Sequence, residues 1–366
     1  MAIRAGTLEE MVGDVNPSGC YWRGKRVLVT GHSGFKGAWL TLWLHRLGAQ
    51  VTGISLPPAT QPNLFRLAQV DSLCDSHFCD IRDYAELERL VAAARPEIAF
   101  HLAAQPLVRA SYREPMGTFA TNVQGTVHVL EALRSVATVK SAVIVTTDKV
   151  YRNHEWVWPY RETDALGGHD PYSASKAAAE LVTASYRESF LRGQGVAVAT
   201  ARAGNVIGGG DWSEDRLIPD AIRAWQAGHA LTLRRPQATR PWQHVLEPLA
   251  GYLSLAERLH ADPATAGEYN FGPQLHDFAS VQQVISGAQV IYGSGDVVTT
   301  LAPEGPHEAG WLALETAKAS SVLGYMPRWS LIDSVRRTIE WYRAQAAATS
   351  ARQLCEQDIA DFESCA

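Results

Sequence analysis

Short hydrophobic runs alternate with longer segments of helical spacing through the first two hundred residues of the chain. Residues 26–31 read RVLVTG, and residues 36–48 follow with apolar side chains at every third or fourth position. Similar strand-like runs lie at 50–56, 97–104, 140–147 and 196–206. Helical spacing recurs at 84–95, 116–136 and 171–191. Such regular alternation predicts right-handed βαβ units around a parallel sheet.

The alternation breaks after about Val206. Helices are expected at 216–227 and 246–261, on either side of an extended basic segment, and the tail from about Ala344 is helix-prone but has no predicted place. We therefore predict an α/β fold, with a Rossmann-type doubly wound parallel sheet and a smaller, interleaved C-terminal α/β substrate lobe. The division assigns 21–205 and a return segment at about 244–262 to the nucleotide-binding domain, 206–243 and 263–345 to the substrate-binding lobe, and 1–20 and 346–366 to terminal extensions.

Composition narrows the functional classes. The chain has 366 residues, of which 46% are hydrophobic and 19% charged, which is typical of a folded protein with a large core. A net charge of −5 without a long basic block argues against nucleic acid and anionic membranes as partners. The five cysteines form no C-x-x-C pair, so no zinc site or disulfide framework is indicated. The N-terminus lacks a signal-peptide pattern and no stretch could span a bilayer, so we expect a cytoplasmic protein.

The turn between the first strand and the first helix, VTGHSGFKG, is rich in glycine. Its glycines are spaced three and three, unlike the two-and-three spacing of G-x-G-x-x-G. Glycine permits a tight turn and a close approach of main-chain amides to a pyrophosphate at a helix N-terminus. Plain turns also recruit glycine, but after the first strand of an α/β chain this one predicts a dinucleotide cofactor. We expect contacts from Gly31, Ser33, Gly34, Phe35, Lys36 and Gly37.

The type of dinucleotide is less well specified. An acidic residue normally ends the second strand and binds the adenosine ribose, but Ser55 stands there in GISLPP. No arginine follows directly to bind a 2′-phosphate, so NAD is expected and NADP is not excluded. Asp80, in FCDIRD, is a candidate for the adenine amino group or, equally, for a helix cap.

Tyr172 and Lys176 stand four residues apart in PYSASK, so they share one face at the start of a helix. A lysine ammonium there can lower the pKa of the phenol and hold the nicotinamide ribose, which makes Tyr172 a base for a sugar hydroxyl. Upstream, Thr147, Asp148 and Lys149 end the strand at 140–147. Polar residues at a strand end are usually a solvated loop, but beside the glycine turn and the Tyr–Lys pair they indicate a catalytic site.

These motifs together resemble the extended short-chain dehydrogenase/reductase superfamily. The segments on which this resemblance rests are TGHSGFKG, HLAAQ, TTDK, YSASK and RAGNVIGGGDW. Within it, WRGKRVLVTGHSGFKG, TTDKVY and RPWQHVLEPLAGYL are similar to the CDP-D-glucose 4,6-dehydratases, over about residues 22–342. The dehydratases of dTDP- and GDP-sugars carry Thr-Asp-Glu or Thr/Ser-Glu at the strand end, so the lysine of TTDK points to the CDP-glucose branch.

The resemblance implies a redox-neutral dehydration of CDP-D-glucose to CDP-4-keto-6-deoxy-D-glucose with tightly held NAD. Tyr172, assisted by Thr147, deprotonates the 4-hydroxyl during oxidation at C4. Lys149 then removes the C5 proton, Asp148 protonates the leaving C6 hydroxyl, and the hydride returns to C6. A basic lysine must be neutral, whereas Asp148 next to it favours the charged form, so we expect the two to titrate together. The alternative for Lys149 is a simple salt bridge with Asp148.

The remaining candidate positions follow from the same resemblance. Asn122 is expected to support the site through the main chain, Gln105 to face the glucosyl hydroxyls, and Trp242 to lie near the ligand. Further cofactor contacts are expected from Ile81, Leu102, Ala103, Ala104 and Asn122. The expected substrate-binding residues are Gln105, Thr147, Asn205, Arg234, Arg240 and His307.

Two other functional readings remain. One keeps the fold but changes the reaction, to an epimerase or to a dehydratase acting on another nucleotide sugar; the Asp148–Lys149 pair argues against epimerisation. The other is a non-catalytic NAD(P)-sensing regulator, which the presence of both Tyr172 and Lys176 disfavours. The superfamily usually dimerises through the helices at 116–136 and 171–191, so a homodimer, or a tetramer, is expected.

Overall fold

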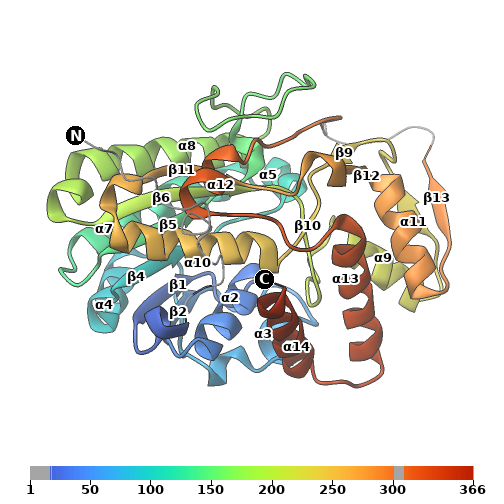
Figure 1. Cartoon of the computed structure of the whole chain (residues 1–366), viewed down its shortest axis with the longest axis horizontal. Helices are drawn as coiled ribbons and strands as arrows, with labels where there is room; N and C mark the ends of the chain where they lie inside the picture. Colours follow the sequence, from blue (N-terminus) through green and yellow to red (C-terminus); the bar gives the residue numbers. More distant parts are fainter. Residues whose placement is uncertain (1–16, 18, 301–308, 366) are drawn as a thin grey trace, which may run out of the picture.

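A seven-stranded parallel sheet forms the centre of the computed structural model, which describes residues 17, 19–300 and 309–365 (Figure 1). The strand order is β11-β6-β5-β4-β1-β2-β3. The strands are β1 (Arg26–Thr30), β2 (Gln50–Ser55), β3 (Asp75–Phe78), β4 (Ile98–His101), β5 (Ser141–Val145), β6 (Ala197–Ala203) and β11 (Gly267–Phe271). Because all neighbours pair in parallel, their carboxyl ends share one edge of the sheet.

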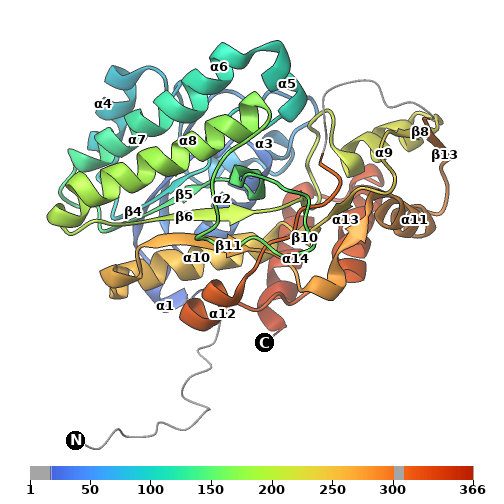
Figure 2. The same cartoon turned by 90° about the horizontal axis from the view of Figure 1, so that it is seen from above.

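Helices cover both faces of this sheet (Figure 2), which explains why its central strands β1, β4 and β5 are mostly apolar and buried. One face is covered by α4 (Tyr84–Ala94), α7 (Gly125–Arg134) and α8 (Pro171–Tyr186). The opposite face is covered by α2 (Phe35–Arg46) and α10 (Leu246–Ala261), where Trp22, Trp39 and Trp43 are fully buried. The predicted α/β class with a doubly wound parallel sheet is therefore confirmed.

Two predicted long helices are interrupted by wider turns. The segment predicted at 116–136 consists of α6 (Pro115–Phe119), a π-helical turn at Ala120–Gln124 and α7. The segment predicted at 171–191 is α8 followed by a π-helical turn at Arg187–Leu191. Helix α5 (Val108–Arg113) was not predicted, and it packs against α8 beside the site described below.

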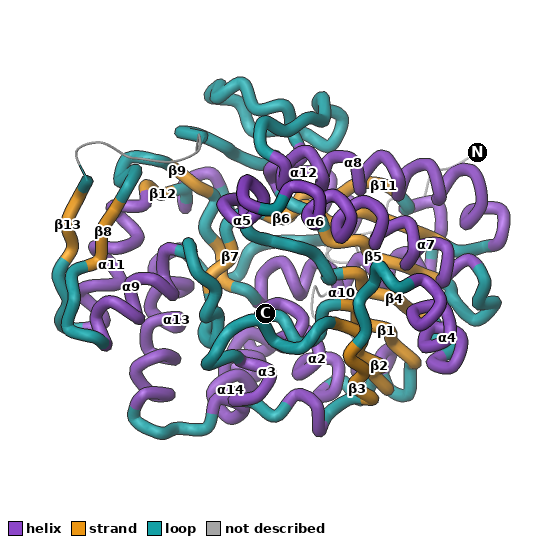
Figure 3. Tube along the Cα trace, turned by 180° about the vertical axis from the view of Figure 1, so that it is seen from behind, coloured by secondary structure: helices purple, strands orange, loops and turns teal. Residues whose placement is uncertain are grey.

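The smaller lobe lies at one end of the sheet (Figure 3). Its helices are α9 (Leu217–Gln226), α11 (Val281–Tyr292) and α13 (Leu331–Ala346). Its strands form the pairs β7 (Val206–Ile207) with β10 (Gln243–His244), β8 (Leu231–Leu233) with β13 (Val297–Thr299), and β9 (Thr239–Arg240) with β12 (Ala279–Ser280). Short helices α1 (Gly19–Trp22), α3 (Leu64–Leu67) and α12 (Ala317–Leu323) complete the chain before its last helix.

Two C-terminal segments lie with the sheet domain. Strand β11 falls in the segment 263–345 that the sequence analysis assigned to the lobe, but it pairs with β6 as the outermost strand of the main sheet, which corrects that boundary. Helix α14 (Ala351–Ser364) packs on α2, where the Trp43 indole donates to Glu363 at 2.8 Å and Arg46 forms an ion pair with Glu363 at 3.0 Å. In the described part of the chain, no helix is both long and apolar enough to cross a membrane.

Candidate active site

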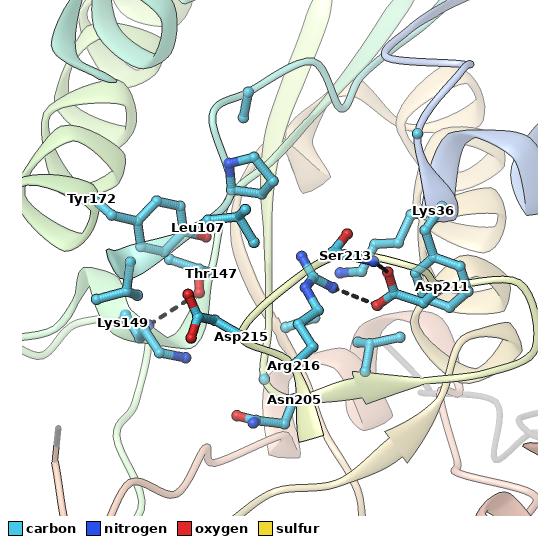
Figure 4. Close-up of a pocket in the computed structure, with 18 of the residues that line it drawn as sticks. Lys36, Leu107, Thr147, Lys149, Tyr172, Asn205, Asp211, Ser213, Asp215 and Arg216 are labelled. Carbon is cyan, nitrogen blue, oxygen red and sulfur yellow. Dashed lines mark hydrogen bonds and ion pairs between the residues drawn. The ribbon is translucent and has the colours of Figure 1, made fainter. Parts of the chain in front are cut away.

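A cavity of about 1270 Å³ lies at the carboxyl edge of the sheet, facing the smaller lobe. Its walls come from the segments that follow β1, β2, β4, β5 and β6, together with the first turn of α8 and segments of the lobe. Parallel sheets commonly place their ligands at this edge, where the strand order reverses. Figure 4 shows that Lys36, Thr147, Tyr172, Asn205 and Arg216 come to this cavity from different elements.

The glycine turn forms a cradle that only glycine fits. Gly31 has φ +82°, and a Cβ there would lie 2.7 Å from the main-chain nitrogen of Ala103. A Cβ on Gly37 would lie 2.1 Å from the carbonyl oxygen of Gly31. The N-cap of α2 is Gly34, which offers no side-chain cap, so the first amides of α2 are available to an anion at the cavity. All six expected residues of the turn line the cavity, which fits a dinucleotide pyrophosphate.

The far end of the cavity is formed by residues after β2 and β3. The hydroxyls of Ser33 and Ser55 donate to the carbonyl of Leu56 at 2.7 and 3.0 Å. The Asp80 carboxylate accepts from the Arg82 guanidinium, and this bond lowers the pKa of Asp80. Helix α4 is capped by Asp83 and not by Asp80, so the capping alternative for Asp80 is wrong. The lining residues between 55 and 81 include Asp80 but no arginine or lysine.

Tyr172 and Lys176 both line the cavity from the first turns of α8. Asp170 caps this helix by accepting from the main-chain amide of Ser173. The Lys176 ammonium donates to the carbonyl of Val145 at 3.0 Å, and burial lowers the pKa of Lys176 to about 8. Burial raises the pKa of Tyr172 to about 12, although a hydrogen bond with Thr147 acts in the opposite direction. The lowered phenol pKa that we expected is therefore outweighed by desolvation in this structure.

The TTDK segment places an acid and a base side by side at the end of β5. Thr147 donates to Asp148 Oδ1 at 2.9 Å, and Lys149 Nζ lies 3.3 Å from the same oxygen. The Asp148 side chain is 1% exposed and that of Lys149 is 33% exposed. Asp148 Oδ2 is buried and has no hydrogen-bond partner among the described residues. The salt bridge foreseen for Lys149 exists, and it joins two groups that both face the cavity.

Two expected contacts do not reach the cavity wall. The Gln105 side-chain amide donates to the carbonyl of Leu107 and to the Thr118 hydroxyl, so it is committed within the chain. Asn122 is 1% exposed. Its side-chain amide donates to the main-chain carbonyl of Gln105 and to the Ser175 hydroxyl, and its side-chain oxygen accepts from the main-chain amide of Gln105. Asn122 thus supports the main chain around the site without lining it. Ile81, Leu102, Ala103 and Ala104 do line it.

The other expected substrate residues come from the segment after β6, which carries Asn205, and from the lobe. Asn205, Arg234, Arg240 and Trp242 all line the cavity. Arg234 pairs with Asp215 at 3.0 Å, and the Arg240 guanidinium donates to the carbonyls of Thr239 and Ala309. Asn205 Oδ1 is buried without a hydrogen-bond partner among the described residues. His307 lies outside the described residues.

The sequence matches proteins of known family and activity. The model of the family described as GDP-mannose 4,6 dehydratase matches residues 28–338. The chain belongs to this family. It is 45% identical over 350 residues to the CDP-glucose 4,6-dehydratase of Salmonella typhimurium, covering 94% of this chain and 98% of that protein. It is 32% identical over 278 residues to a dTDP-glucose 4,6-dehydratase of Streptomyces antibioticus, covering 73% of this chain and 76% of that protein.

Solved structures agree with the family fold. A UDP-glucose 4-epimerase of Thermotoga maritima superposes with a TM-score of 0.76 at 23% identity, covering 87% of this chain and 99% of that one. A UDP-glucuronic acid 4-epimerase of Bacillus cereus, in complex with UDP-glucuronic acid and NAD, gives 0.74 at 22% identity, covering 87% and 99%. These likenesses confirm the fold alone.

Sequence reasoning missed a group of charged residues in this family member's cavity. Arg216 precedes α9 and pairs with Asp211 at 3.0 Å (Figure 4). Arg109 lies 3.6 Å from Asp215. Burial, with Arg216 as the next cause, lowers the pKa of Lys36 to about 7. The signal for the loop was the density of charged residues in DWSEDR after the glycine run, but a charged run alone is also typical of a solvated loop. For metals, no cluster of three His, Cys, Asp or Glu side chains that could bind an ion is found in the described ranges.

Proposed function

We propose that this protein is a lyase that converts CDP-D-glucose to CDP-4-keto-6-deoxy-D-glucose with NAD as a resident cofactor. The observation that carries this proposal is the convergence of Thr147, Asp148 and Lys149 with Tyr172 and Lys176 on one cavity. The 45% identity to the Salmonella enzyme over nearly the whole of both chains supports the CDP-glucose substrate. The lysine in TTDK supports the same branch, as the sequence resemblance implies.

These residues divide the proposed chemistry between them. Tyr172, with the hydroxyl of Thr147 at hand, accepts the proton of the sugar 4-hydroxyl. Lys149 removes the C5 proton and Asp148 protonates the C6 hydroxyl, so that one water leaves. Asp148 Oδ2 is suited to carry that proton because its partner oxygen, Oδ1, already accepts from Thr147 and Lys149. When bound, NAD supplies a nicotinamide that accepts the hydride from C4 and gives it back to C6.

The glycine turn and the cavity end near Ser55 are proposed to bind the cofactor. The amides at the start of α2 suit its pyrophosphate, and Lys176 suits the nicotinamide ribose. The lining residues from 55 to 81 include no arginine or lysine that could bind a 2′-phosphate, which favours NAD over NADP. NAD in the solved epimerase with UDP-glucuronic acid is consistent with this choice.

The nucleotide diphosphate of the substrate is assigned to the lobe side of the cavity. Asn205, Arg234 and Arg240 line it there, and Arg suits a diphosphate because its planar fork donates several hydrogen bonds. The identity of the base, cytidine, rests on the similarity to the Salmonella enzyme. The proposed division of the chain therefore keeps the cofactor on the sheet domain and most nucleotide contacts on the lobe.

Incubation of the purified protein with CDP-, dTDP-, GDP- and UDP-glucose tests the proposal. The expected product, by NMR, is a 4-keto-6-deoxy sugar nucleotide from CDP-glucose, without net cofactor reduction. An isomeric sugar nucleotide would identify an epimerase. Faster dehydration of dTDP-, GDP- or UDP-glucose would identify a dehydratase that acts on another nucleotide sugar. Binding of NAD without turnover of any sugar would favour the sensing regulator.

A homodimer is proposed from apolar residues exposed on two neighbouring helices. Met116 and Phe119 on α6 are 82% and 41% exposed, and Leu181 on α8 is 63% exposed. Large apolar side chains that are exposed together on neighbouring helices are typical of an interface. Light scattering of the wild type and of a Leu181→Arg variant tests this, with a monomeric variant as the expected result.

A further inference from the structure

An ion pair between Glu180 and Arg202 lies buried next to the turn that carries Asp148 and Lys149. Glu180 follows Lys176 by one helical turn on α8, and Arg202 lies on β6. Their charged groups are 2.9 Å apart, and both side chains are only 2% exposed. Neither residue lines the cavity, so neither can touch the substrate or the cofactor there.

Each member of this pair holds one end of the same turn. The Thr146 hydroxyl donates to Glu180 Oε1, just before Thr147. Arg202 Nη1 donates to the Tyr151 hydroxyl at 2.8 Å, two residues after Lys149, and Tyr151 donates onward to Asn270 at 2.7 Å. Two hydrogen bonds therefore connect the residues on either side of Asp148 and Lys149 to one buried ion pair.

The hydrogen bonds of the pair are well satisfied, as a buried pair requires. Glu180 Oε2 also accepts from the Thr200 hydroxyl at 2.6 Å, and Arg202 Nε donates to Glu180 Oε1 at 2.9 Å. Two buried charges cost desolvation free energy, and a pair of this kind is weak evidence for stability alone. Fixing the position of another group is a role that apolar residues of the same volume could not fill.

We propose that Glu180 and Arg202 are positioning residues that hold the Asp148–Lys149 turn against Tyr172. The inference rests on the proposed function for its catalytic meaning. Lys176 fixes α8 to the Val145 carbonyl, and Glu180, one turn further, fixes the same helix to Thr146. These two contacts fix the position of Tyr172 on α8 relative to Asp148 and Lys149 after β5.

Two threonines on the same carboxylate give a matched experiment. Thr146→Val removes the hydroxyl that binds the turn to Glu180. Thr200→Val removes a second hydroxyl that binds the same carboxylate, but from within strand β6 and not from the turn. We expect Thr146→Val to lower kcat about tenfold to a hundredfold, because displacements of about 1 Å can cost about 10²-fold. KM for CDP-glucose should change less than twofold, Thr146→Ser should restore kcat, and Thr200→Val should retain it. Equal losses in Thr146→Val and Thr200→Val, or no loss in Thr146→Val, would overturn the positioning role.

Amide hydrogen exchange gives a readout that does not depend on turnover. Peptides covering 146–151 should exchange faster in Thr146→Val than in Thr200→Val or the wild type. Failure of the wild type to convert CDP-glucose would refute the proposed function and would leave this comparison interpretable. Unchanged exchange over 146–151 in Thr146→Val would refute the tether itself.

Discussion

The Lys176 ammonium donates a hydrogen bond to the main-chain carbonyl of Val145 at 3.0 Å. This contact joins the helix that carries Tyr172 to the strand whose end carries Thr147, Asp148 and Lys149. A lysine in this position is therefore both a ribose-binding candidate and a link between the two halves of the catalytic group. The link explains why Thr147 and Tyr172, 25 positions apart, line the same cavity.

Tyr172→Phe should abolish the oxidation at C4 without preventing binding. The phenol is the proposed acceptor of the 4-hydroxyl proton, and general acid–base groups contribute about 10²–10⁴-fold. We expect kcat to fall by about that factor while the calorimetric Kd for CDP-glucose changes less than threefold. Tyr112→Phe, on exposed Tyr112 of α5, serves as the control and should keep its activity. Comparable activity in Tyr172→Phe and wild type would remove the phenol from the mechanism.

Asp148→Asn and Lys149→Met separate the two roles in the elimination. Solvent deuterium at C5 of the sugar reports proton removal by the base, and the 6-deoxy product reports protonation of the leaving hydroxyl. Lys149→Met should lose both signals. Asp148→Asn should retain C5 exchange but form the product at least about a hundredfold more slowly. The opposite pattern would exchange the roles of the two residues.

The fold was predictable because strands and helices impose different patterns of apolar residues on the chain. Strands buried on both faces are apolar along most of their length, as Val27–Val29 and Ala142–Val145 are, and the helices between them keep one apolar stripe. Local interruptions were not predictable in this way. The π-helical turns at Ala120–Gln124 and Arg187–Leu191 lie inside segments whose apolar spacing predicts one continuous helix.

The candidate site was predictable where motif and strand end coincide. Glycine turn, TTDK and YSASK all reach the cavity, because each follows or faces a carboxyl end of a strand. Gln105 was misplaced because its side chain satisfies the Leu107 and Thr118 groups, a choice that depends on the fold of α5 and α6. The pairing of Arg216 with Asp211 joins two residues of one loop, five positions apart, and leaves no periodic signal.

Gly37→Ala tests the cofactor cradle by binding rather than by turnover. The added methyl would lie 2.1 Å from the Gly31 carbonyl oxygen, so the turn must move away from its present course. Calorimetric affinity for NAD should fall at least about tenfold. Gly193→Ala introduces the same methyl where no atom lies within 4 Å and should bind NAD as the wild type does. Unaltered affinity in Gly37→Ala would place the pyrophosphate elsewhere.

His101 should make the protein less stable in mild acid. The ring on β4 is 2% exposed, contacts Thr30 Oγ1 at 2.7 Å and Thr126 Oγ1 at 3.1 Å, and burial lowers the pKa of His101 to about 3. Since the folded pKa lies below the unfolded value of about 6.5, the unfolded chain binds more protons in that window. The stabilisation is therefore complete above pH 6.5 and is lost as the pH falls toward 3.

A single histidine of this kind changes the free energy of unfolding by up to about 1.4 kcal/mol per pH unit. His32 and His244, whose pKa values burial lowers to about 4 and about 3, act in the same direction, so the test compares slopes and not absolute stabilities. Urea unfolding of His101→Asn between pH 7 and 5 should show a slope smaller than wild type by about that amount. His229→Asn, at an exposed histidine, should keep the wild-type slope. Equal slopes in His101→Asn and wild type would mean that the buried ring takes up its proton without unfolding.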